Sequence, residues 1–288
     1  MKIFAIIPVH NRKEITRNCL NRLVNQTTDN LSVVVVDDGS QDGTSEMILQ
    51  EYPHVVLLNG DGNLWWTGAM NKGIEYVLNV CEPKDYVLAI NDDLSVPDDY
   101  LENLSASIER FPISLIGSVI VNIKDRDTVL SGSIKINWWT AKRANVDAGK
   151  KITSFPKGYS AETSVLTGRG VLIPVEVLET VGFYNESHYK QYSDTELTKR
   201  AEKAGYKLVI SYDSIVYSKP LKTNNIIIDG TYKITDFWKY FFNDHSNTNL
   251  KFRFWFAYDT ANNFFQGTIF LLCDLARITF HFFKLLKI

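Results

Sequence analysis

The chain has 288 residues, of which 45% are hydrophobic and 22% charged, and its formal net charge is −2. These values are typical of a globular protein long enough for one large α/β domain with an appendage. The near-neutral charge argues against nucleic acid as a partner, because nucleic-acid-binding proteins normally carry a basic surface. Cys19, Cys81 and Cys273 lie far apart without CxxC spacing, which argues against a disulfide framework or a zinc site and favours a reducing compartment.

The first residues predict a strand and not a signal peptide. The apolar run of residues 3–9 is short, and Arg12 and Lys13 follow it at once. No window of the sequence approaches the ~18 uninterrupted apolar residues of a membrane-spanning helix. We therefore expect a cytoplasmic protein.

Short apolar runs and helical patterns alternate along the first 220 residues. Strands are predicted at 3–9, 31–36, 55–58, 86–90, 115–123, 166–174 and 208–217, and helices at 15–23, 44–49, 66–80, after 97–99, 175–181 and after 194. Because the strand runs are apolar throughout, both faces should be covered by helices, as in an α/β fold. Residues 124–160 show no clear periodicity. Their Trp138-Trp139 pair could stack on a sugar ring or pack inside the protein.

The strand at 86–90 ends abruptly in Asn91-Asp92-Asp93. Open α/β sheets bind ligands at the carboxyl edge of the strands, so these side chains should face a ligand. Their oxygens suit Mg²⁺ or Mn²⁺, which one or two carboxylates hold together with substrate phosphates. The alternative is a polar loop in which Asp98 caps the next helix.

Other strands end in polar residues at the same predicted edge. Residues 8–12 follow the first strand, Asp37-Asp38 end the second, and Asn63 follows the third. Asp38 could accept hydrogen bonds from a ribose or a base, or could simply belong to a turn with Gly39 at positive φ. The chain has no GxGxxG and no Walker motif here, so a metal, Arg12 or backbone amides must meet phosphate charge.

Three stretches in this order carry a resemblance to a known family. Residues 6–12 (IIPVHNR), 33–44 (VVVVDDGSQDGT) and 88–93 (LAINDD) resemble the family 2 inverting glycosyltransferases. Residues 63–73 are similar to the segment before the metal motif in members that build bacterial surface polysaccharides, including rhamnosyltransferase-like enzymes. The resemblance covers residues 1–220. It implies a GT-A fold, in which helices flank a mixed sheet, and a UDP- or dTDP-sugar donor.

The family also implies roles for individual residues. Asp93 would contact Mn²⁺ or Mg²⁺ as the last residue of the DxD motif, and Asn91 stands at its first position. Asp38 would contact the nucleobase or ribose. The other residues expected around the donor are Pro8, Arg12, Asn63, Trp66, Gly68, Asn71, Asp92 and Arg169. For Arg169 a surface salt bridge is the alternative. The metal-binding His that some relatives carry after the strand at 208–217 is replaced here by Tyr217-Ser218-Lys219.

Asp194 falls where this family places its catalytic base, just before a helix. An acceptor hydroxyl is a poor nucleophile until a base removes its proton. A metal ion would stabilise the departing diphosphate as its charge develops. The alternative is that Asp194 only favours the start of the helix.

The end of the chain, residues 221–288, is predicted to be an aromatic, basic and helical tail. Residues 237–288 hold 16 of the 36 aromatic residues. Within 268–288, the polar residues Asp274, Arg277, His281 and Lys284 form one helical stripe beside a wide apolar arc. This pattern indicates a helix lying on a membrane surface. Packing on the catalytic domain or on a second copy, as in a homodimer, remains open.

The sequence therefore favours a metal-dependent inverting glycosyltransferase on the cytoplasmic face of the membrane. It would transfer a hexosyl or deoxyhexosyl group to a hydroxyl of a glycan or lipid-linked acceptor in surface polysaccharide synthesis. A sugar-phosphate nucleotidyltransferase is one alternative, but it should carry a Gly-rich loop after the first strand. A non-catalytic nucleotide-sugar-binding scaffold is the other, and it should lack Asp93 or Asp194. The proposal requires these two carboxylates to face a common cleft.

Overall fold

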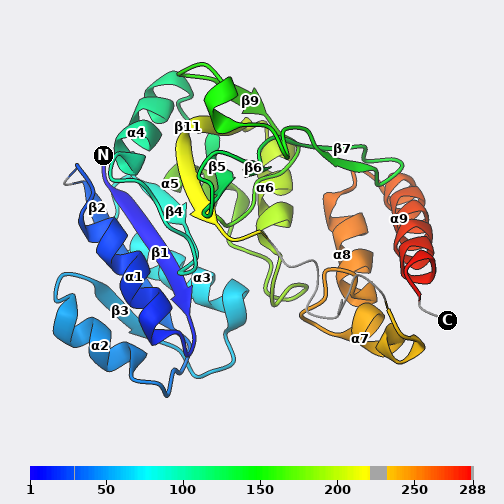
Figure 1. Ribbon diagram of the computed structural model, residues 1–288, viewed down its shortest axis with the longest axis horizontal. Coiled ribbons are helices and arrows are strands. Elements are labelled where there is room, and N and C mark those ends of the chain that lie inside the picture. The colour runs from blue at the N-terminus through cyan, green and yellow to red at the C-terminus, as the bar shows by residue number, and fades with distance from the viewer. Residues whose placement is uncertain (29, 221–231, 287–288) are drawn as a thin grey trace.

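The computed structural model describes residues 1–28, 30–220 and 232–286, and within them a nine-stranded mixed sheet lies between layers of helices (Figure 1). The strand order is β3-β2-β1-β4-β10-β5-β11-β9, and β6 pairs with β5. The strands are β1 (Ile3–Val9), β2 (Leu31–Asp37), β3 (Val56–Asn59), β4 (Tyr86–Ala89), β5 (Leu115–Asn122), β6 (Val129–Ser131), β7 (Ile134–Ile136), β8 (Arg143–Asn145), β9 (Ser160–Glu162), β10 (Val171–Pro174) and β11 (Leu208–Ser218).

The helices cover both faces of this sheet and continue beyond it. They are α1 (Lys13–Val24), α2 (Thr44–Glu51), α3 (Trp65–Leu78), α4 (Tyr100–Arg110), α5 (Val175–Val181), α6 (Asp194–Lys203), α7 (Phe237–Phe242), α8 (Leu250–Thr260) and α9 (Phe264–Lys284), with short 3₁₀ turns at Ile152–Ser154 and Ile234–Asp236. One core joins α1, α2 and α4 to one face of the sheet, and a second joins α3, α5 and α6 to the other. The prediction of strands buried on both faces is confirmed.

Strand pairing brings the later part of the chain to the carboxyl end of β4. β10 runs antiparallel between β4 and β5 and pairs Val171 with Ala89. The loop before β10 therefore lies beside the loop after β4. A bridge between Ser95 and Tyr217 adds the end of β11 to the same edge. These pairings, and not closeness in sequence, assemble the site.

Two stretches differ from the sequence prediction. β10 begins at Val171, five residues later than expected, because residues 167–170 form a loop whose Gly170 has φ +90°. Residues 124–160 contain short strands, including the β7–β8 pair, which extends from the sheet towards α9 (Figure 1). Strands of three residues are too short to show a hydrophobic period.

The described part of the tail forms α7, α8 and α9, and α9 packs on α8. Its buried residues are Phe270, Asp274, Ile278 and Phe282, together with Gln266 and Gly267. The prediction of a solvent-facing polar stripe is wrong at Asp274, which is 1% exposed because two arginines pair with it. Residues 221–231 and 287–288 of the predicted tail lie outside the described residues.

The Trp138-Trp139 pair belongs to the loop between β7 and β8. The Trp138 ring lies 5.9 Å from Phe270 and 6.2 Å from Phe256, centroid to centroid. Trp139 is exposed and meets the edge of Phe265. Packing against the C-terminal helices therefore accounts for Trp138, and the strand pair is fixed to α8 and α9.

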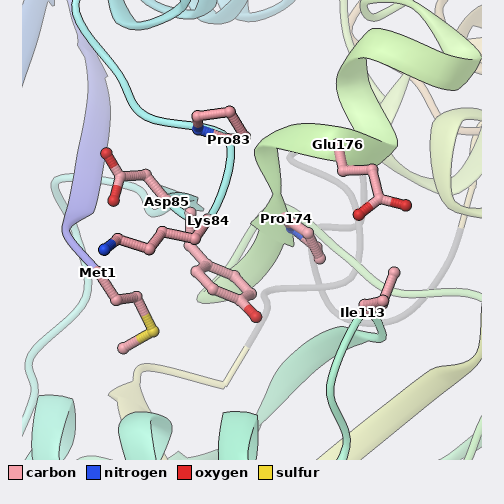
Figure 2. Close-up of a pocket in the computed structure, with 8 residues that line it drawn as sticks. Met1, Pro83, Lys84, Asp85, Ile113, Pro174 and Glu176 are labelled. Carbon is pink, nitrogen blue, oxygen red and sulfur yellow. The ribbon is translucent and has the colours of Figure 1, made fainter.

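A cavity of about 390 Å³ lies at the edge of the sheet where β1 and β4 begin, opposite their carboxyl ends (Figure 2). Its lining includes Met1, Asp85 and Tyr86, at or before the amino ends of β1 and β4, and Pro174 at the end of the antiparallel β10. The polar strand ends lie at the carboxyl edge, so this cavity is separate from the predicted site.

Candidate active site

The three residues after β4 point in different directions. Asp93 is exposed and makes no side-chain hydrogen bond or ion pair with any residue that the structure describes. Asp92 is buried and accepts a hydrogen bond from Arg12 Nη1 at 2.9 Å and one from Thr16 Oγ1 at 3.4 Å. Burial raises the pKa of Asp92, and the positive charge of Arg12 opposes this shift. Asp92 thus holds Arg12 at this edge, and its expected contact with the donor stays a prediction.

Asn91 contacts Trp66, another residue that we expected beside the donor from the family resemblance. The Trp66 indole Nε1 donates a hydrogen bond to Asn91 Oδ1 at 2.9 Å. The same ring lies against Gly168, where an added Cβ would be 2.4 Å from it. Trp66 therefore links the loop after β4 to the loop before β10, and the absence of a side chain at Gly168 makes this contact feasible. The metal role of Asn91 stays a prediction.

Asp93 is the carboxylate of this loop that remains available to a metal ion. Within the described residues, no three His, Cys, Asp or Glu side chains cluster as a metal cage would require. Mg²⁺ is commonly bound by one or two carboxylates, with substrate phosphates and water completing its coordination. One open carboxylate at the carboxyl edge of the sheet fits such an ion.

Asp38 folds the loop between β3 and α3. Its two carboxylate oxygens accept hydrogen bonds from the Gly62 and Trp65 backbone N–H groups, at 2.8 and 2.9 Å. Gly60 must lack a side chain, because a Cβ there would lie 2.6 Å from Asp38 Oδ1. Trp65 has φ +57°, an uncommon value for a residue with a side chain, and the bond to Asp38 helps to hold it there. The predicted contact of Asp38 with a nucleobase or ribose stays a prediction.

Of the other residues expected around the donor, some lie at the surface and some in the interior. Pro8 is partly exposed at the end of the first strand, and Asn63 is exposed on the loop that Asp38 holds. Asn71 is buried on α3, and its amide exchanges two 3.0 Å hydrogen bonds with the Tyr184 backbone. Gly68 lies against Glu186, whose carboxylate would be 2.9 Å from a Cβ. Asn71 and Gly68 thus position the turn at 182–186 in this structure.

Asp194 is the first residue of α6 and is half-buried. Its Oδ2 accepts a hydrogen bond from Gly168 N at 2.7 Å, and its Oδ1 accepts one from Thr195 N at 2.8 Å. Burial raises its pKa, while the two N–H groups and the positive charge of Arg143 act in the opposite direction. A carboxylate with a raised pKa and a fixed orientation has the properties of a general base.

Arg169 lies in the loop before β10 and contacts the end of β11. Its Nη2 donates a hydrogen bond to Ser218 Oγ at 2.6 Å. Burial lowers the pKa of Arg169, and the negative charges of Asp93 and Asp194 counteract this. Ser218 ends β11, so this hydrogen bond joins the loop before β10 to the end of β11.

Sequence reasoning missed Arg143, whose positive charge acts on Asp194. It named Ser218 in the stretch after the strand at 208–217 but not as the partner of Arg169. Arg143 lies in β8, within the stretch that showed no periodicity. No sequence signal marks Arg143, because only the fold brings β8 near α6.

The geometry of this edge agrees with a family assignment. The family model described as glycosyl transferase family 2 matches residues 4–161, which is more than half of the chain. This chain belongs to glycosyl transferase family 2. The match includes the strands that end in Asp38 and Asp93, and it favours a glycosyltransferase over the nucleotidyltransferase alternative.

Curated relatives of this family 2 chain include proteins of glycan synthesis. Glycosyltransferase AglE of Haloferax volcanii is 28% identical over 74% of this chain. The N-acetylglucosaminyl-diphospho-decaprenol L-rhamnosyltransferase of Mycobacterium tuberculosis is 26% identical over 61% of it. This chain spans 65% and 62% of these two proteins, less than two thirds of their length.

Solved structures support the fold. The crystal structure of GalNAc-T7 with UDP, GalNAc and Mn²⁺ superposes with a TM-score of 0.61 over 76% of this chain and 44% of that one, at 14% identity. At this identity the likeness shows the fold alone. The chain has the GT-A fold, and the prediction of a mixed sheet flanked by helices is confirmed.

Proposed function

We propose that this chain transfers a hexosyl or deoxyhexosyl group from a UDP- or dTDP-sugar to a hydroxyl of a glycan or lipid-linked acceptor. The reaction inverts the anomeric carbon and belongs to surface polysaccharide synthesis. The observation that supports the proposal is a chain of contacts from Asp194 to the loop that carries Asp93: the Gly168 N–H binds Asp194, and Trp66, which lies against Gly168, binds Asn91. These loops lie at the carboxyl edge of the sheet, where α/β sheets bind ligands.

In this mechanism Asp194 takes the proton of the acceptor hydroxyl. The Gly168 and Thr195 N–H groups fix its orientation, and its raised pKa makes it a stronger base than an exposed aspartate. Attack comes from the face opposite the leaving nucleotide, so one displacement inverts the centre. A base on the acceptor side and a diphosphate on the other side account for this outcome.

Asp93 would hold Mg²⁺ or Mn²⁺ on the donor side, where the ion neutralises charge on the departing diphosphate. Arg169 adds a positive charge between the donor and the base, and Arg12 presents a half-exposed guanidinium from its pairing with Asp92. Mn²⁺ in the GalNAc-T7 structure supports the ion, and UDP there supports the nucleotide. The name of the mycobacterial relative supports a lipid-linked acceptor.

The outer face of α9 supports a place at a membrane surface. Phe265, Leu272, Phe280 and Phe283 lie opposite the buried face of this helix and are 56–69% exposed. Arg277 and Lys284 are exposed beside them and could meet anionic lipid headgroups. Among residues 1–28, 30–220 and 232–286, none of the helices is both long enough and apolar enough to cross a bilayer.

The Asp194→Asn variant tests the catalytic proposal. It keeps the size of the side chain but removes the base, so turnover should fall about a hundred- to ten-thousand-fold while UDP affinity stays unchanged. Glu202→Gln, at an exposed position of the same helix, is the matched control and should keep normal turnover. Normal turnover in Asp194→Asn would refute the proposed base and favour the scaffold alternative.

A further inference from the structure

A loop of the C-terminal tail, residues 243–249 between α7 and α8, contacts the proposed active site through His245. The imidazole ring of His245 stacks on Trp65, with the ring centroids 4.8 Å apart and the planes at 28°. Its backbone carbonyl accepts a hydrogen bond from the Tyr192 hydroxyl at 3.1 Å, and its Nδ1 lies 3.4 Å from Gln191 Nε2. One exposed residue of the tail therefore meets two segments that are far apart in the chain.

Both segments that His245 contacts belong to the proposed site. Trp65 begins α3, and its backbone N–H donates a hydrogen bond to Asp38, which we expect on the nucleotide side. Tyr192 lies two residues before Asp194, the proposed base. His245 therefore spans the donor side and the base side of the site.

Trp65 and Tyr192 share an uncommon backbone conformation. Their φ angles are +57° and +63°, in the left-handed region that favours glycine. A residue with a side chain stays there only where its surroundings hold it, and such residues gather at functional sites. Asp38 supplies one restraint on Trp65, and His245 contacts both residues. Loss of the His245 contacts should let Tyr192 relax and shift the start of α6.

A second set of contacts joins α3 to the loop before the base. The Thr67 N–H donates a hydrogen bond to the Lys190 carbonyl at 3.1 Å, and the Thr67 and Ser193 hydroxyl oxygens are 2.8 Å apart. Lys190 Nζ lies 5.0 Å from the centroid of the Trp65 ring. Thr67 and Ser193 are fully buried, whereas His245 is exposed. His245 is therefore the member of this junction that can be changed without disturbing the core.

Hydrogen bonds fix the loop that presents His245. The hydroxyl groups of Ser246 and Thr248 both donate to the Tyr240 carbonyl of α7. Tyr240 is buried, and its own hydroxyl donates to the Ile278 carbonyl of α9 at 3.1 Å. The tail helices therefore hold His245 in a defined place, which a residue must have if it is to restrain others.

We propose that His245 is a positioning residue of the transfer reaction. It holds Trp65 and Tyr192 in place, so that Asp194 stays aligned with the donor. This assignment rests on the proposed function, because it takes Asp194 as the base. A misplacement of about 1 Å can cost about a hundredfold in rate, so even a partial loss of alignment should be measurable as a lower kcat. The tail thereby has a part in the reaction besides its proposed contact with a membrane.

The His245→Ala variant tests this role. It removes the ring that stacks on Trp65, so kcat with a UDP- or dTDP-sugar donor should fall about tenfold while the Kd of UDP stays within about twofold. His245→Phe keeps a flat ring and the backbone carbonyl and should retain kcat within about twofold. His54→Ala, on the exposed turn between α2 and β3, is the matched control and should keep normal kcat.

Three results of these measurements would overturn the proposal. They are normal kcat in His245→Ala, an equal loss of kcat in His245→Phe, and a loss of UDP affinity as large as the loss of kcat.

Tyr192→Phe removes the hydrogen bond to the His245 carbonyl and tests the second contact. Its kcat should also fall, and the double variant with His245→Ala should lose little more than the weaker of the two single variants, because both contacts belong to one restraint. Losses that multiply in the double variant would show two unrelated effects and would contradict a shared restraint.

Hydrogen–deuterium exchange tests the restraint without any turnover. Backbone amides of residues 189–195 should exchange at least about tenfold faster in His245→Ala than in the unsubstituted protein, and His245→Phe should restore slow exchange. Unchanged exchange in His245→Ala would overturn the proposal at any level of activity. Asp194→Asn turnover reports on the proposed function separately, so the two ideas can fail independently.

Discussion

The carboxyl edge of the sheet and the C-terminal helices use their side chains in opposite ways. At the sheet edge the apolar residues are buried in the strands, and polar groups gather at the loops, some paired inward and one, Asp93, left open. On α9 the charged Asp274 is buried and aromatic residues such as Phe265 face outward. The first arrangement suits a polar ligand, whereas the second suits an apolar surface.

A buried aspartate has a different role in each of these two regions. Asp92 and Asp274 are both buried and both pair with arginine. Asp92 holds one guanidinium at the donor edge. Asp274 is shared by two guanidinium groups, one from α8 and one from α9, and so joins these helices. Variants that change one region and leave the other intact test whether these roles are separate.

Among the variants that separate the two regions, Asp93→Asn should give the largest loss of turnover. Removal of the open carboxylate weakens the hold on Mg²⁺ or Mn²⁺, so turnover should fall about a hundred- to a thousand-fold. Initial rates across a Mn²⁺ titration measure this loss. Asp98→Asn, at an exposed position beyond the same loop, should behave like the unsubstituted protein. A normal Mn²⁺ response in Asp93→Asn would contradict the metal role of Asp93.

Substitutions on the apolar face of α9 should cause the largest loss of membrane binding. A triple serine variant at Phe265, Leu272 and Phe283 should weaken binding to phosphatidylglycerol vesicles by about tenfold or more, because apolar area no longer enters the bilayer surface. Vesicle co-sedimentation measures this.

The matched control changes three exposed apolar residues of the other region to serine. These are Ile15, Val24 and Leu49, which lie on α1 and on α2. Their loss should leave vesicle binding intact. Equal effects of the two triple variants would show that α9 has no special part in membrane binding.

Asn71→Ala should reduce stability by about 2 kcal/mol, because the Tyr184 backbone N–H and C=O lose their partner in the interior. Urea unfolding measures the free energy of unfolding. Asn63→Ala, on the exposed loop, should stay within about 0.5 kcal/mol. If Asn71→Ala keeps full stability and loses donor affinity instead, Asn71 contacts the donor as the family resemblance implies.

The smallest expected effect is a shift of the acidic limb of the pH profile of kcat/KM towards higher pH. Asp194 must be ionised to accept a proton, and burial raises its pKa. Activity should therefore fall by about tenfold per pH unit on the acidic side, beginning above the usual aspartate range. An acidic limb at the pKa of an ordinary exposed aspartate would argue against Asp194 as the base.

The polar strand ends were predictable, and their inward contacts were not. An apolar run that stops at Asp93 indicates an edge position, since a strand buried on both faces must end where polar residues begin. Nothing in the local sequence shows that Asp38 binds the Gly62 and Trp65 amides, or that Asn71 binds the Tyr184 backbone. Those partners lie 24 to 113 residues away and meet only in the folded chain.

Local patterns in the amino-acid sequence were sufficient to predict the α/β layers, the order of most strands and helices, and the carboxylates at 93 and 194. Hydrophobic periodicity and turn residues encode these features locally. The folded structure was needed to show which carboxylates stay open, which side of α9 is buried, and that Arg253 and Arg277 share Asp274. Each of these depends on contacts between segments far apart in the chain, and burial and charge pairing act through space and not along the sequence.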